Sequence, residues 1–286
     1  MQSDFLTRIK NTYNQFGAAE ARVADRVLLD PQRVVFMSIS ELADSCKVSD
    51  STVFRFCQKL GVGGYQEFKT LLSLGIREDK DTAGEGEAEK CNENATPFMR
   101  RAAGILETDV EALRETCAAV REEDIKEAVG LLHEARRIAF FGAGVSLLSA
   151  MQAANRFTRI TNKVSCVQDT HLQAMQAALL QPGDAAVIFS YSGASKDTVQ
   201  TAQIAKKAGA RLICISRFSK SPLSGYADML LISGGNEGPL QGGSASAVMC
   251  QLFLADVLYE EYYRRYYEEC RANHEKTSAV IADKLY

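Results

Sequence analysis

Two different hydrophobic patterns divide the chain. Upstream of residue 78, apolar residues recur every three or four positions, which is the spacing of amphipathic helices. One such stripe consists of Phe5, Ile9, Tyr13 and Phe16. A second helical stripe follows and stops at Asp30-Pro31. We therefore expect an all-α domain over residues 1–77.

From about Arg137 onward, short apolar runs alternate with helical segments. Each run is bounded by Gly, Pro, Asp or Ser and is too short for a buried helix, which favours strands. The runs cover residues 138–141, 164–167, 185–190, 211–216 and 229–232. Strands that alternate with helices indicate a parallel sheet covered on both faces. The pattern predicts an α/β domain over residues 122–268, with a five-stranded parallel sheet flanked by helices.

The two patterns are separated by an acidic stretch. Residues 78–97 carry many acids and, before Pro97, no large apolar residue, a composition typical of a linker. Helical spacing resumes there, so a connecting helix is expected at 98–121. The last residues, 269–286, show no clear pattern and are expected to form a C-terminal tail.

Composition excludes several classes of site. The eight cysteines form no CxxC pair and do not group with the three histidines, which argues against a zinc site and a redox dithiol. We expect no metal and no cofactor. No apolar run approaches the ~20 residues of a membrane span, and the polar start does not resemble a signal peptide. The sequence predicts a cytoplasmic protein without a membrane partner.

The segment 38–69 has the pattern of two short helices joined by a tight turn. Ser38 and Glu41 fit a capping box that opens the first helix. Val48 is expected to plug the core at the turn, Ser49 to cap the second helix, and Gly61 to end it. This is the arrangement of a helix-turn-helix, but spacing alone fits an ordinary helical hairpin with a solvated polar face equally well.

The second helix carries polar residues that suit DNA. Those expected to face outward are Asp50, Ser51, Thr52, Arg55 and Lys59. A helix-turn-helix places the start of this helix in the major groove, where hydroxyls and guanidinium groups contact phosphates and base edges. The candidate DNA-binding residues are Ser49, Ser51, Thr52, Arg55 and Lys59. Residues 1–77 hold ten basic and eight acidic residues, so their charge of +2 does not decide between the two interpretations.

A family resemblance favours DNA binding. The segment LADSCKVSDSTVFRFCQKLGVGGYQEFK closely resembles the N-terminal domain of RpiR-type transcriptional regulators. The matched elements are Leu42-Ala43, Val48-Ser49, Thr52-Val53, Arg55-Phe56, Lys59-Leu60-Gly61, Gly64-Tyr65, Phe68 and Lys69. The resemblance implies a transcriptional regulator that binds double-stranded DNA through this domain.

Two loops in the α/β region suit a phosphate. The first expected strand is followed by Gly142-Ala143-Gly144-Val145-Ser146 and the third by Ser190-Tyr191-Ser192-Gly193-Ala194-Ser195, each before a helix. Glycines and hydroxyls at a helix start offer neutral donors to a phosphate. Leu147 stands where a dinucleotide fingerprint needs its third glycine. The alternative is that the serines are only N-caps and turn residues.

The region 122–260 resembles the SIS domain, which binds phosphosugars. The matched segments are 142–146, 182–184, 190–195, 205–210 and 221–228. By resemblance, the ligand-binding residues are Gly144, Ser146, Ser190, Ser192, Gly193 and Ser195. Asp169 and His171 stand where relatives often carry polar residues that face the ligand. Ala247-Val248 replaces the Ser-Arg pair of many members, which leaves the identity of the sugar open.

Three functions remain in competition. The first is a regulator of carbohydrate metabolism genes, a homodimer or homotetramer whose operator is a palindrome and whose effector is a phosphorylated sugar. The second is a phosphosugar isomerase or related enzyme, for which Glu237 and His171 are the candidate bases. The third is a DNA-binding protein with a degenerate ligand pocket. The helix-turn-helix favours the regulator, with no catalytic residue.

Overall fold

The computed structural model describes residues 5–81, 96–235, 245–282 and 284, with the side chains of 77–81 left aside. The described residues form two compact units, one up to residue 106 and one over residues 107–235 and from 245 onward. The boundary falls within one helix, α7 (Pro97–Ala119). Among the described residues, no helix is long and apolar enough to cross a membrane.

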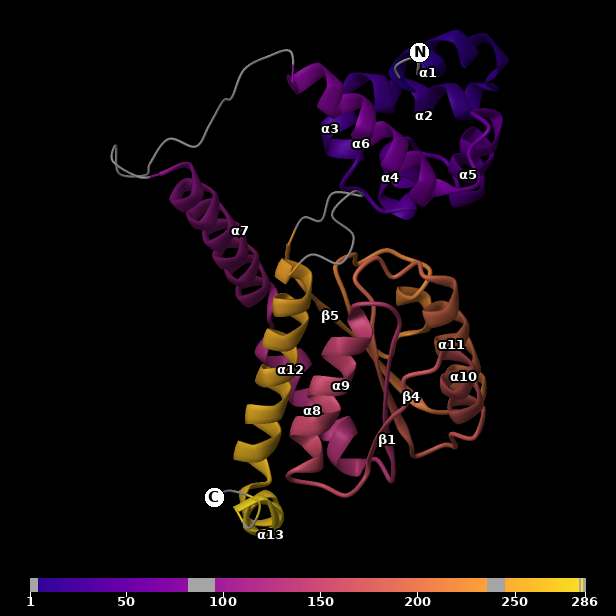
Figure 1. Cartoon of the computed structure of the whole chain (residues 1–286). Helices are drawn as coiled ribbons and strands as arrows, with labels where there is room; N and C mark the ends of the chain where they lie inside the picture. The colour runs from indigo at the N-terminus through magenta and orange to yellow at the C-terminus, as the bar shows by residue number, and fades with distance from the viewer. Residues whose placement is uncertain (1–4, 82–95, 236–244, 283, 285–286) are drawn as a thin grey trace. The chain divides into compact units, whose positions relative to one another are not determined.

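The first unit is helical, as its hydrophobic periodicity predicts. Its elements are α1 (Phe5–Thr12), the 3₁₀ turn η1 (Tyr13–Gln15), α2 (Ala18–Leu29), α3 (Pro31–Val34), α4 (Ile39–Ser45), α5 (Asp50–Lys59) and α6 (Tyr65–Asp81). These helices pack together as one bundle (Figure 1). They enclose one apolar core in which Leu42, Phe56 and Phe68 are fully buried. The Phe56 and Phe68 rings meet edge to face, with centroids 5.6 Å apart.

Local sequence signals set the geometry of the α4–α5 pair. The predicted capping box is confirmed, because Ser38 Oγ accepts from Glu41 N at 3.1 Å and Ser38 N donates to Glu41 Oε2 at 2.8 Å. In the turn, Lys47 has a φ of 53°, the left-handed conformation, and Val48 packs against the core. Gly61, with a φ of 67°, follows the end of α5 as predicted.

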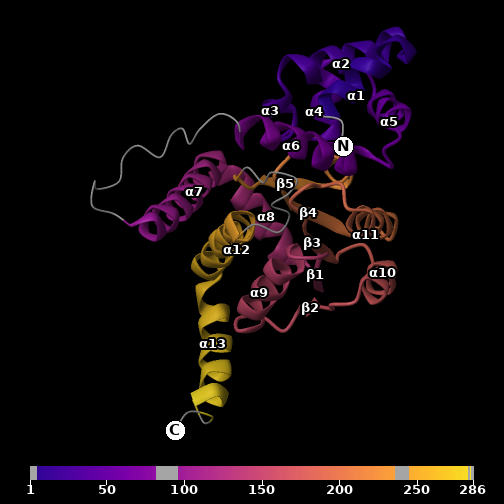
Figure 2. The same cartoon turned by 45° about the horizontal axis from the view of Figure 1, so that its top comes forward.

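The second unit is built on a five-stranded parallel sheet. Its strands are β1 (Ile138–Gly142), β2 (Val164–Cys166), β3 (Ala185–Phe189), β4 (Arg211–Ser216) and β5 (Met229–Ile232). Their order is β2-β1-β3-β4-β5, and all four pairings are parallel. Every residue of β1 and β3 is buried, because helices cover both faces (Figure 2). The predicted fold class is confirmed.

The helices divide between the two faces of the sheet. One face packs against α8 (Glu122–Glu134), α9 (Ser146–Thr158) and α12 (Ala245–Arg265). The other packs against α10 (Thr170–Ala178) and α11 (Lys196–Lys207), with the turn η2 (Ser224–Tyr226) beside them. Alternate residues of β1 point to opposite faces, so Phe140 lies in the first core and Phe141 in the second.

A last helix, α13 (Tyr267–Ala282), occupies the segment expected to be a tail. Cys270 is fully buried in the core, and two side chains fasten the helix to the end of α9. Asn273 donates to the carbonyl of Ile160 and Thr277 to that of Arg159, both at 2.9 Å. The two carbonyls belong to the first residues after α9, so these bonds satisfy backbone acceptors just beyond the end of that helix.

Candidate functional site

The α5 helix presents a polar face, but Thr52 is not part of it. Ser49, Ser51, Arg55 and Lys59 are exposed, whereas Thr52 is only 5% exposed. The prediction that Thr52 faces outward is therefore wrong. It stands one turn before the buried Phe56, on the same side of the helix.

The buried hydroxyl of Thr52 supports the exposed residues around it. Arg55 Nη2 donates to Thr52 Oγ1 at 3.1 Å, and Ser49 Oγ lies 3.1 Å from the same oxygen. Ser49 Oγ also lies 2.8 Å from Ser51 Oγ, and its side chain caps no backbone N–H. Ser49, Ser51 and Arg55 thus form one hydrogen-bonded group at the start of α5.

Lys59 is already engaged within its own unit. Its Nζ lies 2.6 Å from Glu20 Oε2 and donates to the carbonyl of Gln15 at 3.0 Å. The pair ties the end of α5 to α2. Phe54, beside Arg55, is 41% exposed and was not predicted as a surface residue of α5. The only feature of the sequence that indicated its exposure was its place between polar positions of the helix.

The two serine-rich loops lie at the carboxyl ends of neighbouring strands. β1 and β3 are adjacent in the middle of the sheet, and the helices that follow them, α9 and α11, cover opposite faces. The chain order reverses between these two strands, which is where open α/β sheets bind their ligands. The topology therefore brings residues 142–146 and 190–195 to the same edge of the sheet.

The loop after β1 is fixed by two glutamines from distant elements. Gln173 of α10 donates to the Gly142 carbonyl at 2.9 Å. Gln251 of α12 donates from Nε2 to Ser146 Oγ at 3.1 Å. Ser146 begins α9 and is 5% exposed, whereas Gly144, with a φ of 57°, is exposed. The backbone of this loop thus stays accessible while its serine is held in place.

The loop after β3 is held by its own serines. Ser190 Oγ accepts from Gly193 N, and Ser192 Oγ accepts from Ala194 N, both at 3.2 Å. Ser195 is exposed at the start of α11, and its side chain makes no capping hydrogen bond. Ser190 and Ser192 therefore act as turn residues here. Each hydroxyl keeps its own hydrogen to donate elsewhere.

Gly193 fits its place only because it lacks a side chain. Its φ of 60° is left-handed, and a Cβ there would collide with the side chain of Ser221. Its carbonyl accepts from Leu223 N at 2.9 Å. The matched 221–228 segment thus packs directly under the serine loop.

Gln251 contacts the candidate site through Ser146 and was not predicted from the sequence. It is 1% exposed, and its Oε1 makes no hydrogen bond among the described residues. The hydroxyl of Ser149, one turn after Ser146, is also buried without a partner in that set. Buried polar atoms are normally paired. The feature of the sequence that could have indicated Gln251 is that its amide stands alone in an otherwise apolar part of α12.

The comparisons with known proteins agree with this arrangement. Residues 3–78 match the family described as "Helix-turn-helix domain, rpiR family", and residues 131–261 match the SIS domain. An uncharacterized HTH-type transcriptional regulator of Haemophilus influenzae is 32% identical over 279 residues, covering 98% of this chain and 96% of that protein. This chain belongs to the RpiR family of transcriptional regulators.

Other RpiR-family relatives match over most of their length. The HTH-type transcriptional regulator HexR of Pseudomonas aeruginosa is 30% identical over 228 residues, 80% of this chain and 78% of its own. Among solved structures, the Vibrio vulnificus NanR protein complexed with ManNAc-6P has a TM-score of 0.87 and 26% identity. It covers 99% of this chain and 100% of its own.

The other residues that the sequence of this RpiR-family chain singled out lie on different elements. Asp169 caps α10, accepting from Leu172 N at 3.0 Å, and both Asp169 and His171 are exposed. Ala247 is the first residue of the Ala247-Val248 pair that replaces the Ser-Arg pair of many members, and it is buried, with 2% exposed. Glu237 lies outside the described residues. Within the described chain, no three His, Cys, Asp or Glu residues are grouped to hold a metal.

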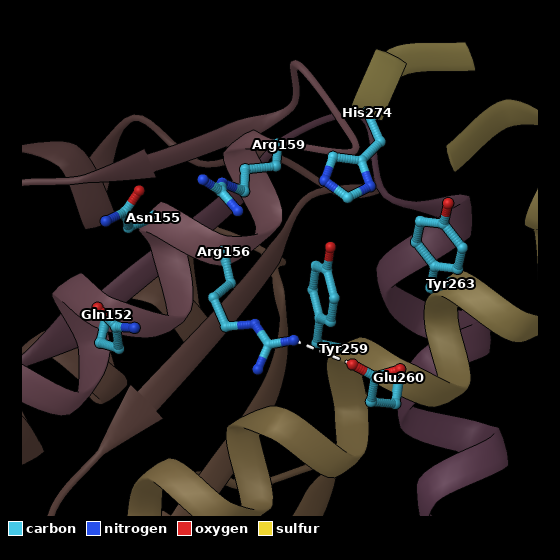
Figure 3. A pocket seen from close by; sticks show the side chains of 8 residues that line it. All are labelled: Gln152, Asn155, Arg156, Arg159, Tyr259, Glu260, Tyr263 and His274. Carbon is cyan, nitrogen blue, oxygen red and sulfur yellow. Dashed lines mark hydrogen bonds and ion pairs between the residues drawn. The ribbon is translucent and has the colours of Figure 1, made fainter. Parts of the chain in front are cut away.

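A polar pocket of about 600 Å³ lies elsewhere, between α9, α12 and α13. Figure 3 shows the side chains that line it: Gln152, Asn155, Arg156, Arg159, Tyr259, Glu260, Tyr263 and His274. Arg156 stacks 4.1 Å from the Tyr259 ring centroid and pairs with Glu260 at 3.0 Å. None of the serines of the two loops lines this pocket, so it is separate from the candidate ligand site.

Proposed function

We propose that this RpiR-family protein is a DNA-binding regulator of carbohydrate metabolism genes whose activity is controlled by a phosphorylated sugar. One observation carries the proposal. Two glycine- and serine-rich loops meet at the strand-order reversal of a chain that is similar over 99% of its length to NanR complexed with ManNAc-6P.

The proposed DNA contact is the exposed start of α5. Arg55, oriented by Thr52, is placed to reach a guanine edge or a phosphate. Ser49 and Ser51 supply hydroxyls for the backbone. Lys59 contributes charge, although its pair with Glu20 competes for it. A two-fold assembly of the chain would present two such helices to the half-sites of a palindromic operator.

The proposed phosphate site combines both serine loops. Free backbone N–H groups at the starts of α9 and α11 face the carboxyl end of the sheet, and such groups bind anions. Ser146, Ser190, Ser192 and Ser195 add hydroxyls, and Gly144 and Gly193 allow the phosphate close to the backbone. A phosphate monoester suits a site with many neutral donors.

We propose regulation and not catalysis. An aldose–ketose isomerase needs a base beside the reacting carbons, and His171 is an exposed residue in the first turn of α10. Relatives that match this chain over most of its length are named transcriptional regulators. The likeness of the second unit to a putative sugar-phosphate isomerase, at 16% identity, concerns the fold alone.

The test separates the two activities in the full-length protein. DNA is selected from a randomised double-stranded library, and sugar binding is measured by calorimetry with a panel of hexose 6-phosphates that includes ManNAc-6P. Arg55→Ala should weaken the selected DNA at least tenfold, about 1.4 kcal/mol, and leave sugar affinity unchanged. Arg33→Ala, which removes the same charge from the exposed side of α3, is the matched control.

Ser192→Ala should do the reverse, weakening the hexose phosphate and sparing DNA in the absence of sugar. Ser278→Ala, on the exposed side of α13, is its control. Equal DNA affinity of Arg55→Ala and the parent would overturn the α5 assignment. Turnover of any hexose phosphate by the parent protein would replace regulation with enzymatic function.

A further inference from the structure

The polar pocket of Figure 3 is built wholly within the second unit, by α9, α12 and α13. Arg159 follows Asn155 by four residues and Arg156 by three, so these side chains share one side of the end of α9. Aromatic rings of α12 and α13 complete the wall: Tyr259, Tyr263 and His274. The volume of about 600 Å³ is typical of a small-molecule site.

Arg159 brings a positive charge to this pocket. Its carbonyl accepts from Thr277 Oγ1 at 2.9 Å, which holds the residue at the junction of α9 and α13. Its side chain is exposed and, among the described residues, makes no ion pair. Arg156 differs, because both Asp256 and Glu260 pair with it. Arg159 is therefore placed to bind an incoming anion.

The hydroxyl of Tyr259 opens into the pocket, although the residue is only 6% exposed. Its ring is covered by Arg156, 4.1 Å from the centroid, and meets Phe157 edge to face at 5.6 Å. The hydroxyl makes no hydrogen bond within the part of the chain that the structure describes, and it points toward the side of the pocket where Arg159 and His274 lie (Figure 3). Buried tyrosine hydroxyls usually find a hydrogen-bond partner, and a ligand would supply one here.

The polar groups of the pocket are mainly hydrogen-bond donors. Arg159 offers a planar fork of N–H groups, which matches a carboxylate or a phosphate. Burial raises the pKa of Tyr259, so its hydroxyl keeps its proton and can donate. Asn155 adds an amide that can donate as well. The acid of the lining, Glu260, is already paired with Arg156, so the donors favour an anionic ligand.

We propose that this pocket is a second ligand site, which binds a small organic anion, a carboxylate or a phosphate ester, with the charged group on Arg159. The Tyr259 hydroxyl donates to the same group. The body of the ligand packs against the rings of Tyr263 and His274, which meet edge to face at 5.9 Å. A volume of about 600 Å³ exceeds the size of an inorganic ion, so the ligand is an organic molecule.

Small probes of matched shape test the charge and the headgroup. Binding of benzoate, benzamide and phenyl phosphate to the full-length protein is measured by ligand-observed NMR titration. Benzoate and benzamide have nearly the same shape and differ in charge, so benzoate should bind about tenfold more tightly. The ratio of the affinities for benzoate and phenyl phosphate tells which headgroup the pocket prefers, and either preference supports the site.

Two substitutions assign the binding to this pocket. Arg159→Gln should weaken the tighter-binding anion about tenfold, and Tyr259→Phe about threefold, because each removes a donor to a charged group. Lys207→Gln removes an exposed charge from α11, on the other face of the sheet, and is the control for the arginine. Tyr267→Phe removes a phenol of α13 that is 49% exposed outside the pocket lining, and is the control for the tyrosine.

Three results would overturn the proposal. The first is that the parent protein binds neither anion, and the second is that it binds benzoate and benzamide equally. The third is that Ser192→Ala weakens the anion while Arg159→Gln does not, because the anion then occupies the serine loops. These measurements involve neither DNA nor a sugar, so their failure is distinguishable from a failure of the proposed function.

Discussion

The side-chain amide of Gln251 donates to the hydroxyl of Ser146, with 3.1 Å between Nε2 and Oγ, and so joins α12 to the first serine loop. We expect Gln251→Leu to weaken the tightest-binding hexose 6-phosphate about tenfold, because Ser146 loses the donor that orients it. Stability should change little, since the substitution also removes the unpaired Oε1.

Calorimetry and thermal denaturation of the same samples check this prediction. Gln152→Leu, on the exposed side of α9, is the control. A loss of affinity accompanied by an equal loss of stability would mean that Gln251 supports the fold and not the site.

Gly193 is the most constrained position of the second loop. Gly193→Ala should destabilise the protein by roughly 1–3 kcal/mol, because of the positive φ and the collision with Ser221. It should also abolish hexose phosphate binding. Gly130→Ala in α8, where an added Cβ meets no atom within 4 Å, should instead stabilise by about 0.5–1 kcal/mol. Urea titration measures both, and a neutral Gly193→Ala would contradict the described loop.

Asp184 makes folding stability depend on pH. Burial raises the pKa of this carboxyl, but the hydrogen bonds from Arg137, at 2.6 Å, and from Gln181 N hold the net pKa below the ordinary 3.8. Its contribution is therefore complete above the unfolded pKa and is lost as pH falls through the folded pKa.

Asp184→Asn should accordingly lose about 1–3 kcal/mol at pH 7 and show a shallower fall of stability below about pH 4. Urea titrations of parent and variant from pH 7 downward provide the comparison. Parallel curves for the two proteins would exclude Asp184 as the titrating group.

The pair between Lys59 and Glu20 stabilises the first unit, and a double variant separates this role of Lys59 from its proposed contact with DNA. Lys59→Met leaves the 7%-exposed Glu20 carboxylate without its cation and should destabilise the first unit by about 1 kcal/mol, since Lys59 is itself 41% exposed. Adding Glu20→Gln should restore stability. The double variant should not recover affinity for the selected DNA, and gel-shift titration measures this. Full recovery of both stability and DNA affinity would mean that Lys59 serves the fold alone.

The central strands β1 and β3 were predictable because every residue in them is buried, so each reads as a continuous apolar run between turn residues. The burial of Thr52 was not predictable from the sequence. Its hydroxyl can be buried because Ser49 and Arg55 form hydrogen bonds with it in the folded chain. Gln251 lies 105 residues from its partner Ser146, a pairing that no local pattern contains. The α13 helix was missed because Cys270 is its single buried residue among those described.

At Gly234 the end of the sheet touches α7 without any side chain between them. A Cβ at this position would lie 2.5 Å from the carbonyl oxygen of Ala112 and 2.8 Å from Thr116 Oγ1. α7 extends about 22 Å from Ala112 back to Pro97, and this close contact limits how the helix can shift against the sheet. We expect Gly234→Ala to shift α7 against the sheet, because the added Cβ has no space beside the carbonyl of Ala112.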